Sequence, residues 1–329
     1  MENFSFSQIK ILITSGCNLC CSHCYQHFEK NKYYLTWRQV KELIDYAANH
    51  NTKLLDFGGG EFFVHPAAYD IIDYCYEKNI SINIATNGVS MNTKKIEKYE
   101  NQEFMTIQVS IDGMREKHEL RRGLGTWDKM MDTVQKLYEL DIKITANMVL
   151  DHTNYLDALS VLQIPYFQQI SFVPIAYVGA ASCGETNSSV EGYEEFVCQL
   201  LREFESDIGR ARVQSFPNTF AVKYDGGVYI SPMASDYSLM CMGNINDENI
   251  SNICERYYVN DKLEQLTNLD ISSLAHCNDC RVSDICDRGS RLRALKFFGD
   301  ISAPDPFLCR LYLDEYKDIQ IGKLFWGIK

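Results

Sequence analysis

The sequence lacks an apolar run long enough to cross a membrane, which takes about 18 consecutive apolar residues. Its amino terminus, Met1 to Phe6, also lacks the basic start and apolar core of a signal peptide. These two absences argue against a membrane-spanning or secreted protein. We therefore expect a cytoplasmic protein without a membrane partner.

Positive charge is scarce as well: 32 Lys and Arg against 44 Asp and Glu give a net charge of −12. Nucleic acid is not an expected partner, because a phosphate backbone binds basic surfaces. The negative charge would suit a cationic substrate such as a basic peptide or an amino sugar, or it could simply keep the protein soluble. Cysteine is abundant, with 13 in 329 residues, and in a cytoplasmic chain this favours metal binding over structural disulfides.

Between residue 8 and about residue 176, strand-like and helix-like segments alternate, as is typical of βα units around a parallel sheet. The expected strands are 9–13, 54–57, 80–85, 105–110, 142–149 and 170–174. The expected helices are 36–48, 65–78, 93–100, 127–140 and 154–162, with Thr36 as the N-cap of the first. In such an α/β fold, functional residues follow the carboxyl ends of the strands.

Three cysteines, Cys17, Cys21 and Cys24, follow the first expected strand, with three and then two residues between them. One short loop can aim three thiolates at a four-iron cluster and leave one iron open for a substrate or cofactor. A zinc site is the alternative, with His23 or His27 as a further ligand. The spacing resembles that of the radical S-adenosylmethionine (SAM) superfamily.

This resemblance implies a partial (β/α)6 barrel and a [4Fe–4S] cluster whose open iron chelates the amino and carboxylate groups of SAM. It implies that an electron, from a donor such as flavodoxin or ferredoxin, cleaves SAM to a 5′-deoxyadenosyl radical. That radical would abstract a hydrogen atom from a substrate carbon. A non-catalytic metal or electron-transfer protein is the alternative from another class, but it would have no need of a SAM pocket.

Further stretches match the family in the same order. Gly58-Gly59-Gly60-Glu61 resembles the segment that holds the SAM amino group, although Phe62 stands where the family usually has proline. Asn87 and Asp112 could equally be turn residues. The cofactor contacts implied by the resemblance are Tyr25, Gly59, Gly60, Glu61, Asn87, Ser110, Asp112, Arg122 and Asn147.

The carboxyl-terminal part changes character, with a hairpin expected over 222–230 and a group of cysteines after it. Four of them could form a complete site for zinc or for a second [4Fe–4S] cluster: Cys277, Cys280, Cys286 and Cys309. Their order resembles the SPASM extension of the radical SAM family, which favours iron–sulfur. Ser231 and Ser290 occupy two ligand positions of that extension, so we expect one auxiliary cluster instead of two.

These expectations divide the chain into a radical SAM core at 1–180, a linker and helix at 181–215, and a small Cys-rich SPASM-like auxiliary-cluster domain at 216–329. Cys241 then has no cluster to bind, near the place where the family holds substrate. We hypothesise that it donates a hydrogen atom to the substrate radical; Cys254 and Cys183 are rivals, and an inert thiol is the plain alternative.

One auxiliary cluster and a lone cysteine resemble radical SAM epimerases of peptides and of aminoglycosides. We therefore expect an epimerase that acts on a ribosomally made peptide in natural-product maturation. The alternative is a dehydrogenase or cross-linking maturase of a peptide or amino sugar, in which the auxiliary cluster accepts an electron.

Overall fold

The computed structural model describes residues 6–24, 32–150, 153–174, 219–230, 240–258, 274, 277, 280, 294 and 298–304. Several predictions lie outside these residues: those on Tyr25, His27, Cys183, the helix within 181–215, Ser231, Cys286, Ser290 and Cys309. Within the described ranges, every helix is too short or too polar to span a bilayer.

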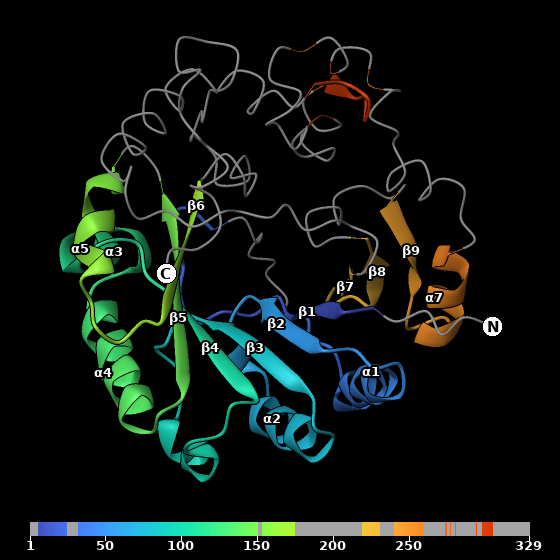
Figure 1. Ribbon diagram of the computed structural model, residues 1–329, viewed down its shortest axis with the longest axis horizontal. Coiled ribbons are helices and arrows are strands. Elements are labelled where there is room, and N and C mark those ends of the chain that lie inside the picture. Colours follow the sequence, from blue (N-terminus) through green and yellow to red (C-terminus); the bar gives the residue numbers. More distant parts are fainter. Residues whose placement is uncertain are drawn as a thin grey trace.

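Six parallel strands form the core of the structure and follow one another in sheet order (Figure 1). They are β1 (Gln8–Thr14), β2 (Leu54–Gly59), β3 (Ser81–Thr86), β4 (Met105–Ser110), β5 (Lys143–Leu150) and β6 (Gln169–Pro174). In β4, Met105, Ile107 and Val109 are buried and the residues between them are half-buried, as the period of two in a strand requires. Because all six strands run the same way, their carboxyl ends meet at one edge of the sheet.

The helices α1 (Trp37–Asn49), α2 (Ala68–Glu77) and α4 (Thr126–Glu139) lie along the outer side of this sheet, and α5 (Ala158–Leu162) precedes β6 (Figure 1). Thr36 caps α1 as predicted: it forms a capping box with Gln39. Val40, Leu43 and Ile44 are buried on one face of α1, which is the spacing of an amphipathic helix.

Two segments differ from the sequence prediction. The helix expected over 93–100 is a pair of short 3₁₀ turns, η2 (Thr93–Lys95) and η3 (Glu97–Tyr99). Conversely, α3 (Arg115–Arg122) was not predicted, because its sequence has no apolar stripe. Its inward face is formed instead by polar side chains, including Arg121 and Arg122, both buried.

The predicted hairpin is confirmed: β7 (Thr219–Val222) and β8 (Gly227–Tyr229) pair antiparallel across a turn in which Gly226 has a φ of +84°. β7 also lies parallel to β1, so the sheet continues without a break from the first six strands through β8 to β9 (Cys241–Asn244). The helix α7 (Ile250–Tyr258) follows β9.

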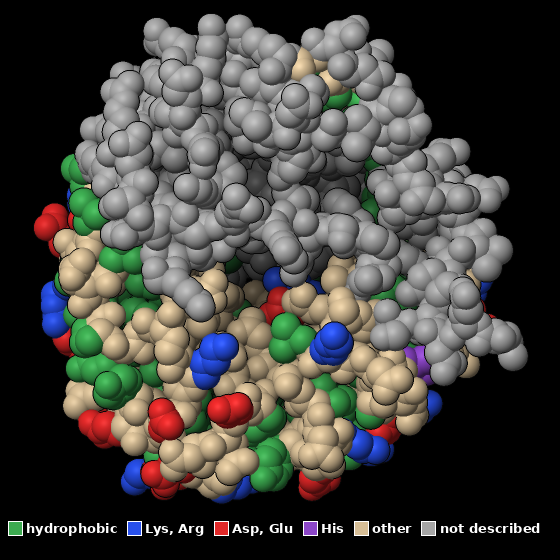
Figure 2. Space-filling model, viewed as in Figure 1, with side chains coloured by type: hydrophobic (Ala, Val, Ile, Leu, Met, Phe, Trp, Pro, Cys, Tyr) green, Lys and Arg blue, Asp and Glu red, His purple; other side chains and the backbone are tan. Residues whose placement is uncertain are grey.

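The described part of the surface carries charges of both signs. On the face shown in Figure 2, Lys and Arg side chains are interspersed with Asp and Glu side chains. The excess of acidic residues is therefore not gathered into a single patch on the described part of this face.

Candidate functional site

The cysteine loop, residues 15–24, leaves the carboxyl end of β1 and is held against the end of β2. The Gly60 N–H donates to the Thr14 carbonyl at 2.7 Å, and the Glu61 N–H donates to the Gly16 carbonyl at 2.8 Å. A Cβ on Gly60 would lie 2.1 Å from the Gly16 oxygen, and Gly59 has a φ of +119°, so both positions need glycine. These glycines let the cysteine loop itself approach the sheet.

Cys17, Cys21 and Cys24 lie on this loop half-buried, and none forms a disulfide. The Cys24 N–H donates to the Cys21 carbonyl at 3.1 Å, so these two residues share a tight turn. Burial raises the pKa of Cys21 to about 11; the Arg122 guanidinium opposes this shift, and the nearby Cys24 and Cys17 add to it. A bound metal would supply the positive charge that turns such thiols into thiolates.

Three thiols on one short loop supply the number of protein ligands that a four-iron cluster with one open iron needs. Among the described residues, no three His, Cys, Asp or Glu side chains converge closely enough to hold one metal ion. In a cubane each thiolate binds a different iron, so three ligands need not meet at a point. His23, which a zinc site would recruit, lies 3.2 Å from the Asp112 carboxylate. The loop therefore suits a [4Fe–4S] cluster.

Asn87 follows β3 and touches the cysteine loop. Its Nδ2 donates to Asn18 Oδ1 at 2.8 Å and lies 3.9 Å from Cys17 Sγ. The Leu19 N–H also points at this sulfur, at 3.4 Å. Two N–H groups are thus directed at Cys17, and donors to ligand sulfurs tune the potential of a cluster.

Glu61 is buried at the end of β2, with 1% of its surface exposed. Its carboxylate accepts the Thr86 hydroxyl at 2.7 Å, the Asn87 N–H at 2.7 Å and the Phe63 N–H at 3.1 Å. Burial raises the pKa of Glu61, and these hydrogen bonds oppose the shift. The carboxylate joins the turn after β3 to the start of the 3₁₀ turn η1 (Phe62–Val64).

Ser110, the last residue of β4, is the register partner of Asn147, which lies within β5. Register partners in a parallel pair point to the same face, and both residues are half-buried. The structure thus brings a hydroxyl and an amide together beside the carboxyl end of β4.

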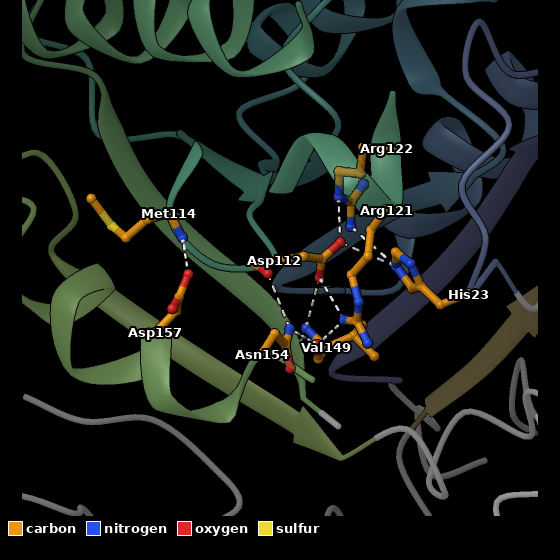
Figure 3. Close-up of polar contacts among 8 residues, drawn as sticks. All are labelled: His23, Asp112, Met114, Arg121, Arg122, Val149, Asn154 and Asp157. Carbon is orange, nitrogen blue, oxygen red and sulfur yellow. Dashed lines mark hydrogen bonds and ion pairs between the residues drawn. The ribbon is translucent and has the colours of Figure 1, made fainter. Parts of the chain in front are cut away.

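Asp112, just after β4, is fully buried among cationic side chains (Figure 3). Its Oδ2 accepts Arg122 Nε at 2.6 Å and lies 3.2 Å from His23 Nε2. Its Oδ1 accepts the Val149 N–H at 3.2 Å and lies 3.8 Å from the Arg121 guanidinium. Burial by itself would raise the pKa of Asp112, but Arg122, His23 and Arg121 hold it below its usual value.

Asn154 and Arg121 extend this cluster to β5. Asn154 Nδ2 donates to the Asp112 carbonyl at 3.1 Å and to the Val149 carbonyl at 2.9 Å, and Arg121 donates to the Val149 carbonyl at 2.7 Å (Figure 3). Sequence reasoning considered His23 only as a zinc ligand and missed Arg121 and Asn154. The available signal was an aspartate at a strand exit followed, nine and ten residues on, by two adjacent basic residues.

The other predicted cysteines lie elsewhere. The Cys280 N–H donates to the Cys277 carbonyl at 3.3 Å, so both stand on one turn, and both are half-buried. Cys241 is exposed at the start of β9, three strands from β1 in sheet order, or about 14 Å at the usual strand spacing. Cys254 is buried on α7.

This parallel βα sheet, with a three-cysteine loop at its carboxyl edge, makes the chain an α/β protein with a candidate cluster site. Residues 11–160 match the family model described as the Radical SAM superfamily. This stretch of the chain therefore carries a radical SAM domain, which agrees with the predicted family, and the observed α/β sheet confirms the predicted fold class. The family implies SAM and a [4Fe–4S] cluster as cofactors.

Two curated relatives and one solved structure illustrate the likeness. Mycofactocin maturase MftC of Mycobacterium tuberculosis (strain CDC 1551 / Oshkosh) is 29% identical over 127 residues, which are 38% of this chain and 32% of that protein. Fe-coproporphyrin III synthase of Methanosarcina barkeri (strain Fusaro / DSM 804) is 24% identical over 354 residues, 92% of this chain and 87% of that protein. The structure of Streptococcus suis SuiB bound to S-adenosylmethionine matches with a TM-score of 0.71 at 13% identity, over 94% of this chain and 78% of that chain.

The chain spans only 32% to 43% of the length of these MftC proteins. The likeness to SuiB, at 13% identity, shows the fold alone.

Proposed function

We propose that this protein is a radical SAM enzyme that matures a ribosomally made peptide by epimerising one of its residues. The observation that carries the radical chemistry is the half-buried three-cysteine loop at the carboxyl edge of the sheet. A peptide substrate is supported by a maturase among the relatives and by a structural neighbour, SuiB, solved with its precursor peptide SuiA. The net charge of −12 would favour a peptide with basic residues.

In this proposal Cys17, Cys21 and Cys24 hold the SAM-binding cluster. When bound, the cluster and SAM supply the radical that removes a hydrogen atom from a substrate carbon. Ser110 and Asn147 face the same side of the sheet as register partners and would bind SAM hydroxyls or substrate.

Cys241 is the proposed hydrogen-atom donor that completes epimerisation. Its thiol is exposed and so open to a substrate, whereas the rival Cys254 is buried. The S–H bond of Cys241 breaks as a new C–H bond forms on the opposite face of the substrate carbon. The sulfur radical that remains takes an electron from the external donor and a proton from water.

The radical chemistry is tested by a pair of cysteine variants. Anaerobically reconstituted protein, with reductant and SAM, should form 5′-deoxyadenosine, and Cys21→Ala should not. Cys20→Ala is the matched control, because Cys20 lies in the same loop outside the ligand spacing and is exposed. Absence of 5′-deoxyadenosine from the wild type, or unchanged formation by Cys21→Ala, would contradict the proposal.

The role of Cys241 is tested by the iron content of wild type and Cys241→Ala. About eight irons in both would mean two [4Fe–4S] clusters and a free Cys241. Loss of iron from the variant alone would make Cys241 a ligand and remove it as a donor.

The second candidate is oxidation, favoured by the turn that brings Cys277 and Cys280 together as part of an electron-accepting auxiliary cluster. It would make the enzyme a dehydrogenase or a cross-linking maturase. In D₂O, epimerisation adds one solvent deuterium to the product carbon, whereas oxidation adds none.

A further inference from the structure

We propose that Asp112 holds the cysteine loop in place through His23 and Arg122, and thus acts as a positioning residue for the cluster. This differs from the contact with SAM that family resemblance implies for Asp112 and Arg122. The inference rests on the proposed role of the cysteine loop as the cluster site.

Three other parts of the chain converge on the carboxylate of Asp112 (Figure 3). Asp112 itself comes from the end of β4, Arg121 and Arg122 end α3, Val149 belongs to β5, and His23 belongs to the cysteine loop. The carboxylate is therefore the point at which the loop is joined to the rigid sheet.

The loop is attached at two consecutive residues, both between Cys21 and Cys24. The Ser22 N–H donates to the Arg121 carbonyl at 3.0 Å, and His23 Nε2 lies 3.2 Å from the Asp112 carboxylate. Any movement of Asp112 or of the end of α3 would therefore displace the stretch that carries the second and third predicted ligands.

The same contacts leave Asp112 with little capacity to bind SAM. Its side chain is fully buried, and each carboxylate oxygen already faces two nitrogen atoms of the protein. Arg122 is 9% exposed, and its Nε is used by Asp112. Ligand-supporting residues that touch the ligands only indirectly commonly change metal affinity by about 10-fold to 100-fold when mutated.

Three variants separate positioning from cofactor contact. His23→Phe keeps a flat ring but removes the nitrogen that meets Asp112, whereas His23→Gln restores a side-chain N–H donor. Asp112→Asn removes the charge and leaves two arginines unbalanced, so it is at greater risk of misfolding. Asp128→Asn is the control, because it breaks an exposed ion pair with Arg115 on the outer surface.

The measurement is the rate of iron loss to a chelator from the reconstituted full chain, followed on the cluster whose EPR signal changes when SAM is added. We expect about 10-fold faster loss for His23→Phe and Asp112→Asn, and a rate near that of the wild type for His23→Gln and Asp128→Asn.

Unchanged iron loss in a folded His23→Phe variant would overturn the inference. So would iron retention with loss of the SAM-induced EPR change in that variant, since His23 would then contact the cofactor. A wild type that binds no cluster would instead contradict the proposed function itself, so the two failures are distinct.

Discussion

The backbone N–H of Asn87 donates a 2.7 Å hydrogen bond to the buried carboxylate of Glu61, and this bond fixes an amide that touches the cysteine loop. The side chain of Asn87 reaches Asn18 and Cys17 from this position. Glu61 therefore acts on the predicted cluster indirectly. It holds Asn87, and Asn87 lies beside the predicted ligand Cys17. Two residues expected to contact SAM are thus tied to the loop that would hold the iron.

The first prediction concerns the potential of that cluster. Asn87→Ala removes one N–H donor directed at the Cys17 sulfur, and such donors stabilise the more negative, reduced cluster. We expect the reduction potential to fall by tens of mV, since a hydrogen bond of about 1 kcal/mol corresponds to about 40 mV for one electron. An EPR-monitored redox titration measures it. A potential equal to that of the wild type would mean that the amide does not reach the sulfur once iron is bound.

The second prediction concerns the glycines after β2. Gly60→Ala would place a methyl group 2.1 Å from the Gly16 oxygen, so the cysteine loop must move. We expect a loss of about 1–3 kcal/mol in the free energy of unfolding and reduced iron content on reconstitution. Gly58→Ala is the matched control, because its nearest contact would be an ordinary 3.7 Å to Leu12. Equal behaviour of the two variants would argue against the close approach.

The third prediction is a pH dependence of stability from His65. Its Nε2 lies 2.8 Å from the Leu35 carbonyl, and its Nδ1 accepts the Ala67 N–H at 3.1 Å. A second proton on the ring would sit on Nδ1 and point at the Ala67 N–H, which is itself a donor. Burial lowers the pKa of His65, only partly opposed by the bond to Leu35. The stabilisation is complete above the unfolded pKa of about 6.5 and is lost as the pH falls toward the lower native pKa.

Urea unfolding at about pH 7.5 and about pH 5.5 measures this effect, which can reach about 1.4 kcal/mol per pH unit. His65→Asn should lose the His65 contribution to the slope, whereas His50→Gln, which keeps His65, should retain it. A wild type and a His65→Asn variant with the same slope would count against the assigned protonation state.

The fourth prediction concerns the join between β7 and the barrel. Phe220 is 1% exposed and packs edge-on against Phe6 with ring centroids 4.7 Å apart. Phe220→Ala should lower the free energy of unfolding by about 3–5 kcal/mol, measured by urea denaturation. Phe298→Ala, at a position 58% exposed, should change it by less than about 0.5 kcal/mol. A comparable loss of unfolding free energy in both variants would show that the packing of Phe220 on β7 does not stabilise the core.

Much of the barrel could be predicted from sequence because its strands bury one face in a regular pattern. Met105, Ile107 and Val109 alternate with polar residues, and the predicted strand 105–110 is the observed β4. The prediction of a helix over 93–100 was wrong. Only Ile96 and Tyr99 of this segment are buried, which is too few to form a continuous apolar face on a helix.

The candidate site was less predictable, because its contacts join residues far apart in the chain. His23 and Asp112 meet only after β1 and β4 are placed in one sheet. α3 was missed because its buried face consists of polar side chains, among them Arg121 and Arg122, which are buried beside Asp112. Periodicity of apolar residues cannot reveal a helix that packs through charge.

The pairing of β7 with β1 has a consequence for how the protein is made. Thr219 follows its partner Gln8 by 211 positions (219 minus 8), so during translation the outer edge of β1 stays bare until most of the polypeptide has left the ribosome. A bare strand edge is prone to pair with other chains, and late long-range pairing slows folding. In a variant truncated near residue 180, the outer edge of β1 would stay without its β7 partner. This variant should aggregate under conditions in which the full chain does not.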